Sequence, residues 1–232
     1  MLFPLKDINP TRHFPVVTLL LVAANVAAFL YQMGTGLQAS ILEWGLVPRA
    51  LFGGGEVVEY LPDYGPVQYG ARPWMDLLAS MFMHGGFLHL AGNMLYLWIF
   101  GNNVEDTLGH TRYLVFYLLS GVAAALAQTV VGPSSSVPMV GASGAISGVL
   151  GAYLLLFPGA HVTTLIILGF FFRVVQVPAM VVLGFWIVLQ VLNGLGSFGA
   201  SGGVAFFAHI GGFVAGMGLL YVLRPRARSR TA

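Results

Sequence analysis

Four polar side chains interrupt long apolar stretches of the sequence, and their types suit nucleophilic and acid–base chemistry. Ser143 lies among small residues in PMVGASGAISGVLGAY, His209 lies in FFAHIGGFVAGM, and His89 and Asn93 lie in FLHLAGNMLYLW. A polar or ionisable residue inside a membrane helix indicates a functional site. A neutral imidazole beside a serine can take the hydroxyl proton, which makes the serine a nucleophile. His209 would be that base, and Asn93 and His89 would donate hydrogen bonds to the resulting oxyanion.

Ser143 also begins its apolar segment, which follows a segment rich in glycine, serine and proline. At a helix N-terminus, free backbone N–H groups and the helix dipole favour negative charge, as an oxyanion requires. No Asp or Glu is placed to orient His209, because Glu105 and Asp106 lie at the opposite end of their own segment. The pattern therefore predicts a Ser–His dyad rather than a triad.

The composition indicates where this chemistry would take place. The chain has 232 residues, of which 57% are hydrophobic and 8% are charged, whereas about a quarter of a soluble domain is charged. This composition indicates an integral membrane protein with room for about six spans of roughly 20 residues. The net charge of +2 gives no argument for nucleic-acid binding, and the absence of cysteine excludes disulfides and thiolate chemistry.

Six apolar segments are long enough to cross a membrane as helices. They are Phe14 to Met33, Gly86 to Asn102, Arg112 to Val131, Ser143 to Phe157, Pro178 to Asn193 and Phe206 to Leu223. Two stretches of about a dozen residues, Trp74 to His84 and Val162 to Phe172, suit interfacial or re-entrant segments. We therefore expect an all-α membrane protein with six helices and a long outer loop between the first two. It would be a single domain over residues 1–232, with its core at about 14–223.

The Lys and Arg residues predict the orientation of this bundle. Eight of the ten fall on one side of the predicted spans, and only Arg49 and Arg72 fall on the other. Because Lys and Arg collect in cytoplasmic loops, both termini are predicted to be cytoplasmic, with a short basic tail at residues 224–232. The compact six-span form without a targeting sequence favours a prokaryotic plasma membrane.

Three of the candidate residues fall at a similar depth in their segments. Each lies at the start of fifteen residues that lead to the cytoplasmic end, from Ser143 to Phe157, from His209 to Leu223 and from His89 to Asn103. This length is roughly 22 Å of a core about 30 Å thick. Asn93 follows His89 by four residues, so it lies on the same helix face one turn deeper. The segments therefore bring these side chains to one level below the outer surface.

Other interpretations of the same residues are open at this stage. Small residues at four-residue spacing, as in GAISG, are typical of helix packing in membranes, and such packing is compatible with catalysis. His84, His89 and His209 together could bind a metal, but zinc sites usually need three or four ligands and no carboxylate or cysteine lies at that depth. A transporter would need charges or broken helices at mid-depth. The remaining histidines are expected in solvated loops: His13, His110 and His161.

Three motifs in order along the chain resemble the rhomboid family of intramembrane serine proteases. They are HGGFLHLAGN (His84 to Asn93), GASG (Gly141 to Gly144) and AHIGGFVAG (Ala208 to Gly216). The resemblance also covers GLVP, the Trp74 stretch, GNNVED and RYLVFYLLSG. It implies an endopeptidase that cleaves single-span membrane proteins near the outer part of their transmembrane segment, with small residues favoured at the cut. It also implies that no cofactor is needed, and no metal site is predicted.

The same resemblance implies a role for each candidate residue. Ser143 would be the nucleophile and His209 the general base, while His89, Asn93 and the Ser143 backbone N–H would hold the oxyanion. Supporting positions would be His84, which orders the loop or a water, and the glycines Gly141, Gly144, Gly212 and Gly216. The last two would pack the sixth segment on the fourth. Glu105 and Arg112 would brace the cytoplasmic turn.

Two positions depart from the family pattern. Ser147 stands where many members have an aromatic residue on which the catalytic histidine packs, and ARPW (Ala71 to Trp74) stands where a Trp–Arg pair is frequent. Two glycine- and serine-rich outer loops, Gly132 to Pro138 and Asn193 to Gly203, lie next to the predicted site. We expect the second to act as a mobile cap and the fifth segment to move aside for substrate. The alternative function is a catalytically silent rhomboid-like protein that binds membrane helices.

Overall fold

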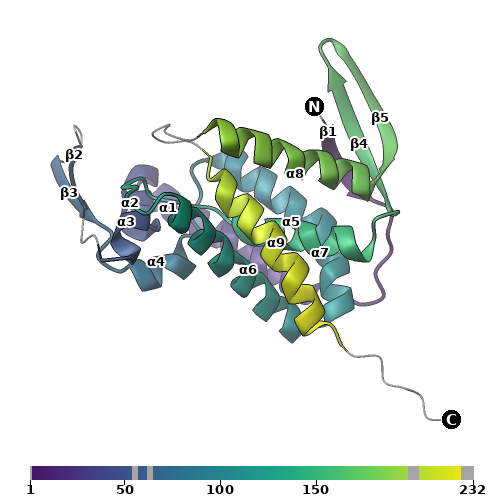
Figure 1. Cartoon of the computed structure of the whole chain (residues 1–232), viewed down its shortest axis with the longest axis horizontal. Coiled ribbons are helices and arrows are strands. Elements are labelled where there is room, and N and C mark those ends of the chain that lie inside the picture. The colour runs from purple at the N-terminus through teal and green to yellow at the C-terminus, as the bar shows by residue number, and fades with distance from the viewer. Residues whose placement is uncertain (1, 54–56, 62–64, 198–203, 226–232) are drawn as a thin grey trace.

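A computed structural model of the chain describes residues 2–53, 57–61, 65–197 and 204–225, and most of them lie in a helical bundle (Figure 1). The six longest helices of this described part are α1 (Val16–Thr35), α5 (Phe87–Leu108), α6 (His110–Val131), α7 (Ser143–Leu156), α8 (Ala179–Gly196) and α9 (Phe206–Leu223). Four of them, α1, α6, α8 and α9, are long and apolar enough to cross a membrane. The prediction of an all-α membrane protein is therefore confirmed in part, because the structure is mostly helical.

The two other long helices, α5 and α7, are not among the helices that are both long and apolar enough to cross a membrane. α7 is apolar but has only 14 residues. α5 has 22 residues, but they include three Asn and two acidic residues. It runs six residues beyond the predicted end of its span at Asn102, because the polar sequence NNVEDT continues the helix. The six-span count therefore stays a prediction.

α7 is the central helix of the bundle, and α8 is peripheral. α7 contacts α5, α6 and α9 and buries ten of its 14 residues, from Gly144 to Tyr153. α8 buries only five of its 18 residues. In Figure 1, α8 lies along one side of the bundle, next to α9. α9 also packs extensively on α6 and α7, whereas α8 does not, so α8 is held less tightly than α9.

Glycines allow α7 and α9 to approach closely. A Cβ atom at Gly212 would collide with the carbonyl oxygen of Gly144, and one at Gly216 would collide with the carbonyl oxygen of Gly148. Backbones can come this close only where side chains are missing, as in small-xxx-small packing. The contact fixes the N-terminal turns of α7 and α9 relative to each other.

The long segment between α1 and α5 is structured. It contains α2 (Leu37–Trp44), α3 (Pro48–Leu51), the antiparallel strands β2 (Val57–Leu61) and β3 (Gly65–Tyr69), and α4 (Pro73–Ala79). The apolar stretch from Trp74 to His84 thus corresponds to α4 and the turn that follows it. The segment is tied to the bundle by backbone hydrogen bonds between Leu46 and Met139, at 3.0 and 2.8 Å.

A second apolar stretch forms strands, which the prediction of an all-α fold does not include. Residues from Val162 to Phe172, predicted as an interfacial or re-entrant segment, lie in the hairpin of β4 (His161–Leu168) and β5 (Phe171–Pro178). Its residues are rich in Val, Ile, Thr and Phe, which favour strands, and Gly169 adopts a φ of +58° at the turn. β1 (Leu2–Asp7) pairs with β4 to complete a three-stranded antiparallel sheet. The fold is therefore mostly rather than purely helical, and His161 belongs to a strand rather than a loop.

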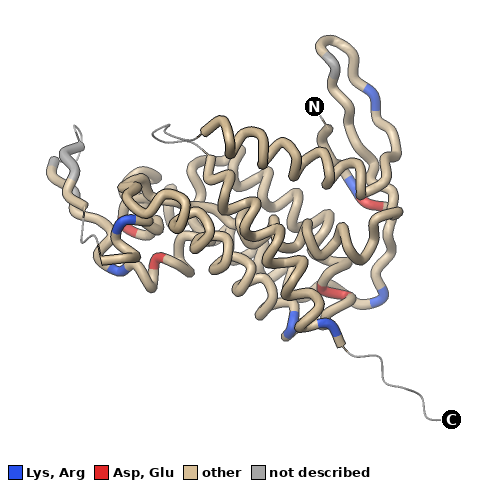
Figure 2. The backbone as a smooth tube through the Cα atoms, in the orientation of Figure 1, with Lys and Arg blue, Asp and Glu red and all other residues tan. Residues whose placement is uncertain are grey.

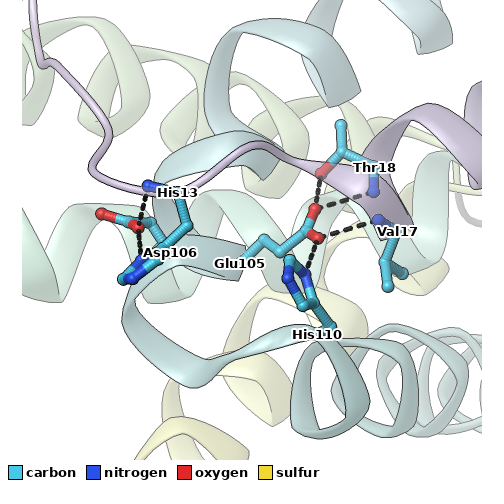
Figure 3. A network of polar contacts seen from close by, with 6 residues as sticks. All are labelled: His13, Val17, Thr18, Glu105, Asp106 and His110. Carbon is cyan, nitrogen blue, oxygen red and sulfur yellow. Dashed lines mark hydrogen bonds and ion pairs between the residues drawn. The ribbon is translucent and has the colours of Figure 1, made fainter.

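Glu105 joins α5 to the start of α1 (Figure 3). Its carboxylate, which is 2% exposed, accepts hydrogen bonds from the backbone N–H groups of Val17 and Thr18, both at 2.8 Å, and from the Thr18 hydroxyl at 2.7 Å. His110 Nδ1 lies 2.6 Å from the same carboxylate. Because α1 has no side-chain cap of its own, Glu105 satisfies N–H groups that the helix leaves free and places negative charge at its positive end.

Asp106 binds the chain just before α1. Its carboxylate accepts hydrogen bonds from the backbone N–H groups of Arg12 and His13 and lies 2.6 Å from His13 Nδ1 (Figure 3). His13 lies exposed in a loop, as expected, and it also contacts a carboxylate. His110 is exposed and contacts a carboxylate as well, but it is the first residue of α6 rather than part of a loop. Arg112 is exposed and forms no hydrogen bond or ion pair that the described part of the chain shows.

Charged residues lie mainly near the two ends of the bundle (Figure 2), and the middles of the six longest helices contain none. Arg49 and Arg72 lie in the segment between α1 and α5, whereas the other described basic residues lie elsewhere: Lys6 in β1, Arg12 before α1, Arg112 in the first turn of α6, Arg173 in β5 and Arg224 directly after α9. This asymmetry is the basis of the predicted orientation, which stays a prediction. Most of the predicted basic tail, residues 226–232, lies outside the described residues.

Candidate active site

Ser143 and His209 meet where α7 packs against α9. Ser143 is the first residue of α7, and His209 lies in the first turn of α9. His209 Nε2 lies 2.8 Å from Ser143 Oγ, which is a hydrogen-bonding distance. Gly144 follows Ser143 directly, and Gly212 lies one turn after His209, so the glycine contact between the helices positions both side chains. The structure thus brings together the two residues predicted as a dyad.

Gln190 of α8 completes the surroundings of His209. Its Oε1 atom lies 2.8 Å from His209 Nδ1, and its amide nitrogen donates to the Trp186 carbonyl oxygen at 3.4 Å. Because the amide nitrogen faces that carbonyl, Oε1 is left to accept the Nδ1–H of the imidazole. Nε2 then carries the lone pair and accepts the Ser143 hydroxyl proton, which is the tautomer that a general base needs.

An aromatic ring from α8 packs beside the same imidazole. The centroids of the Trp186 and His209 rings lie 5.8 Å apart, with an interplanar angle of 37°. Ser147, which stands where the resemblance leads us to expect an aromatic residue, is buried and donates its hydroxyl to the Ser143 carbonyl oxygen at 2.6 Å. The ring beside His209 therefore comes from α8 instead of α7.

His89 presents a donor near Ser143. The backbone N–H of Gly85 donates to His89 Nδ1 at 3.2 Å, so the proton of the neutral ring is on Nε2. Gly141 lies two residues before Ser143. If this residue had a side chain, its Cβ atom would lie only 2.9 Å from Nε2 of His89. Gly141 has a φ of +127°, which other residues rarely adopt. Glycine at this position therefore leaves space between the Nε2–H of His89 and the serine.

Asn93 supplies a second donor at the same place. It is 7% exposed and lies one turn below His89 on α5. Its Nδ2 atom is buried and has no hydrogen-bond partner among the described residues. A buried amide without a partner is costly, and in a cavity its N–H groups are free to bind a ligand. It is well suited to bind an oxygen that is present only during a reaction.

A cavity of about 640 Å³ connects these side chains. It lies among α5, α7, α8 and α9, and its polar wall contains His89, Asn93, Ser143 and His209. Its apolar wall includes Tyr96, Ile146, Leu150 and Trp186. The volume is in the range of small-molecule and peptide-side-chain sites. The cavity can therefore hold an extended peptide segment beside Ser143.

The sequence matches the model of a known protein family. The model of the Rhomboid domain matches residues 71–226, which is more than half of the sequence and includes every candidate residue. The chain belongs to the rhomboid family. It is accordingly an integral, multi-pass membrane protein.

Curated relatives support this assignment. RHOMBOID-like protein 5 of Arabidopsis thaliana is 33% identical over 162 residues, which are 69% of this chain and 47% of the relative. Rhomboid protein 1, mitochondrial, of Saccharomyces cerevisiae is 34% identical over 63% of this chain and 40% of its own length. Rhomboid protease GluP of Bacillus subtilis is 44% identical over 81 residues, 35% of this chain and 15% of the relative. The chain thus spans less than half the length of these relatives.

His84 of this rhomboid chain lies behind the cavity wall. It is fully buried, and its ring packs edge-on against His89, with 5.1 Å between centroids. Its backbone N–H donates to Gln32 Oε1 at 2.8 Å, and the Gln32 amide donates back to the His84 carbonyl at 3.1 Å. α1 therefore holds the turn that carries His84, and His84 in turn supports the His89 ring.

Two further expectations from the sequence concern a metal site and a mobile cap. Within the described residues, no group of three or more His, Cys, Asp or Glu side chains is arranged to hold a metal ion. The predicted cap falls mainly on residues 198–203, which lie outside the described residues. Its described neighbours Ser197 and Val204 line the cavity, as do Ser135 and Pro138 of the other loop.

Sequence reasoning missed Gln190, although a signal for it exists. It is a polar residue in the middle of the apolar sequence FWIVLQVLNG. Glutamine is uncharged, so a pattern of ionisable residues does not single it out as an orienting group for His209. The spacing of four residues from Trp186 puts both side chains on one face of α8, which is the face toward His209.

Proposed function

We propose that this rhomboid is an intramembrane serine endopeptidase with Ser143 as nucleophile and His209 as general base. The observation that carries the proposal is the 2.8 Å contact between Ser143 Oγ and His209 Nε2, in a ring whose Nδ1 is held by Gln190. Relatives named as proteases, such as GluP of Bacillus subtilis, support an enzymatic activity. The dyad needs no cofactor for this reaction.

The proposed reaction has two stages. His209 Nε2 takes the Ser143 proton as Oγ attacks the carbonyl carbon of the scissile bond, and the imidazolium then protonates the leaving amine. The oxyanion would accept hydrogen bonds from Asn93 Nδ2, from His89 Nε2–H and from free N–H groups at the start of α7. A water molecule then attacks the acyl-enzyme with His209 again as base, which frees Ser143.

The proposed substrates are transmembrane segments of membrane proteins. The cavity lies inside a membrane bundle, and its apolar wall suits an unfolding helix, while its polar wall allows water beside Ser143. We place the open side at the outer surface of a prokaryotic plasma membrane, with both termini cytoplasmic, on the distribution of Lys and Arg. Partners are thus the lipid bilayer and membrane-protein substrates, with no role for nucleic acid.

α8 is the proposed entry gate for substrate. It packs less extensively against the rest of the bundle than α5, α7 and α9 do, and it contributes Trp186 to the wall. A Cβ atom at Gly194, near the end of α8, would lie 3.3 Å from the Cβ of Phe206 at the start of α9. This spacing is close to the Cβ separation in disulfides, and the chain has no cysteine of its own. The double variant Gly194→Cys/Phe206→Cys can therefore lock the gate.

We expect the oxidised double variant to stop cleaving a single-span substrate that the wild type cleaves, and to recover on reduction. Labelling of Ser143 by a small fluorophosphonate should continue in the oxidised form, because a small reagent needs no gate. Each single cysteine variant is the matched control. Full cleavage by a protein shown to be cross-linked would exclude α8 as the gate but would leave the dyad proposal intact.

Intact-mass labelling of the detergent-solubilised protein with a fluorophosphonate tests the enzyme proposal itself. Wild type should gain one adduct, and Ser143→Ala and His209→Ala should gain none. Ser120→Ala, which removes a buried serine of α6 that does not line the cavity, should label like wild type. No adduct on folded wild type would favour the alternative, a catalytically silent rhomboid that binds membrane helices.

A further inference from the structure

The tip of the β4–β5 hairpin exposes three consecutive phenylalanines. Phe170 is 99% exposed, Phe171 is 83% exposed and Phe172 is 75% exposed. Adjacent strand residues point to opposite faces, so the aromatic surface surrounds the tip instead of covering one side. A contiguous exposed apolar surface of this kind marks an interaction site. None of these residues takes part in the candidate active site.

The hairpin projects sideways from the bundle. Figure 1 shows β4 and β5 extending past α8, across the direction of the helices instead of onward from the helix ends. β5 ends at Pro178, and α8 begins at the next residue, Ala179. The hairpin thus leaves the bundle at the level where α8 enters the membrane. A strand of eight residues is about 26 Å long, so the tip lies well beyond the bundle surface.

The base of the hairpin is fixed to the bundle, so this direction is set by the fold. β1 pairs with β4 between Leu2↔Ile166 and Asp7↔Val162. The Tyr153 hydroxyl of α7 donates to the Asp7 carboxylate at 3.0 Å, and the Ala179 N–H donates to the Ala160 carbonyl at 2.7 Å. The β1–β4 pairing ends at Ile166, and the aromatic tip lies beyond it.

The charge of the β4–β5 hairpin and the hydrogen bonding of its backbone both suit contact with a lipid surface. The hairpin sequence HVTTLIILGFFFRVVQVP contains no Asp or Glu, and its one basic residue, Arg173, directly follows the three phenylalanines. Arg173 is exposed and forms no ion pair with a described residue. Basic residues next to apolar side chains bind anionic membrane surfaces. At the tip, Ile167 pairs with Phe172 and Leu168 with Phe171, so much of the backbone is already hydrogen-bonded.

The neighbouring surface of α8 continues this apolar region. Met180 and Val181 of its first turn are 58% and 48% exposed, and they face outward beside the base of the hairpin. A membrane must cover these α8 residues, because α8 is one of the helices apolar enough to span it. The same lipid layer that covers the start of α8 is therefore within reach of the tip.

We propose that the tip of the β4–β5 hairpin inserts into the interfacial layer of the bilayer beside α8. Phe170, Phe171 and Phe172 contact the part of the acyl chains next to the headgroups, and Arg173 contacts anionic headgroups. The hairpin is then a lipid-binding element. This proposal does not depend on proteolytic activity.

Site-directed spin labelling tests the proposal, and the absence of native cysteine makes single labels possible. Phe170→Cys would carry a nitroxide in nanodiscs of phosphatidylcholine, or of an equal mixture with phosphatidylglycerol. Collision rates with oxygen, which dissolves in lipid, are compared with those of a water-soluble nickel chelate. Phe185→Cys, on the exposed face of α8, is the lipid control, and Gln68→Cys, on β3, is the water control.

We expect the label at position 170 to favour oxygen over nickel, like the Phe185→Cys label, and to be deeper in the phosphatidylglycerol mixture. Combining it with Arg173→Ala should remove the dependence on phosphatidylglycerol. A label as accessible to nickel as Gln68→Cys would overturn the proposal. A label shielded from both reagents would also overturn it, since it would indicate that a second copy of the chain covers the tip. Equal depth in both lipid mixtures would refute the contact between Arg173 and anionic headgroups.

Discussion

Removing the hydrogen-bond acceptor of Gln190 should slow the serine chemistry without removing either member of the dyad. Gln190→Leu keeps the size of the side chain approximately and deletes Oε1, which lies 2.8 Å from His209 Nδ1. The variant leaves the Nδ1–H without an acceptor and lets the ring adopt the tautomer with its proton toward Ser143. Both changes weaken His209 as a base.

The expected size of the effect follows from the charge that develops on the ring. In the resting state the Nδ1–H bond is between neutral groups and contributes about 0.5–1.5 kcal/mol, whereas in the imidazolium it is charge-assisted and contributes about 1.5–3 kcal/mol. Roughly 1–1.5 kcal/mol is therefore present only in the transition state, which is about a tenfold change in rate. Equal population of the two tautomers adds a further factor of about two.

The assay is the rate constant of fluorophosphonate labelling as a function of pH. Gln190→Leu should label about ten- to thirtyfold more slowly than wild type. Gln190→Glu keeps an acceptor, and its negative charge favours the imidazolium, so the acidic limb of its pH profile should move to higher pH. Val191→Ala, which alters an exposed neighbour on α8, is the control.

These results separate a positioning role from a structural one. A residue that only packs would change the thermal unfolding midpoint but would not move the pH profile. If Gln190→Leu is folded and labels at the wild-type rate, the proposed orientation of His209 by α8 is wrong. The dyad proposal would survive that outcome, because Ser143→Ala tests it separately.

Three further predictions concern the oxyanion site, helix packing and pH. Asn93→Ala should lower cleavage by about 10²–10³ and leave thermal stability unchanged, because its Nδ2 has no partner in the resting structure. Gly212→Ala should lower the free energy of unfolding by about 1–3 kcal/mol, while Gly218→Ala, where a Cβ meets nothing within 4 Å, should not. Burial raises the pKa of Asp76 on α4 from 3.8 to about 6, so the folded state binds its proton more tightly and stability should fall as pH rises between these values. Asp76→Asn should flatten this dependence in unfolding titrations, and an unchanged slope would contradict the assignment.

The helical part of the fold could be predicted because apolar length is a strong signal in a membrane. The segment Phe206 to Leu223 is α9 to the residue, and Ser143 does begin α7. The end of α5 could not be found in this way, because NNVEDT is polar yet helical. There Glu105 and Asp106 bind the start of α1 and the chain before it. Tertiary contacts, rather than hydropathy, extend this helix.

The β4–β5 hairpin shows the limit of reasoning from apolar length. A run of about a dozen apolar residues fits a re-entrant segment, a short helix or a strand, and periodicity alone does not distinguish them. The β-branched residues from Val162 to Ile167 and the turn at Gly169 favour strands, but their partner β1 lies more than 150 residues earlier in the chain. Such long-range pairing is not visible in a local pattern.

More of the candidate site than of the sheet could be predicted from the sequence, because polar residues such as those of the site are rare in apolar segments. Counting to the segment ends placed Ser143 and His209 at one level, and they lie 2.8 Å apart. For His89, the fifteen residues were counted to Asn103, but α5 continues for five more residues. The equal depth inferred for His89 therefore rested on an end of the helix that was placed too early. Gln190 and Trp186 were not predicted as partners of His209, because their roles depend on which face of α8 meets α9.

The position of α8 has a consequence for how the proposed gate and the dyad work together. α8 supplies both Gln190, which holds His209 Nδ1, and Trp186, whose ring lies beside the imidazole. Movement of α8 away from α9 would therefore separate both groups from His209 while it admits a substrate. His209 would be an oriented base only when α8 has returned. The locked Gly194→Cys/Phe206→Cys variant should accordingly label with fluorophosphonate at least as fast as wild type, although it no longer cleaves transmembrane segments. Slower labelling after cross-linking would contradict this coupling, because a fixed α8 should keep the base in place.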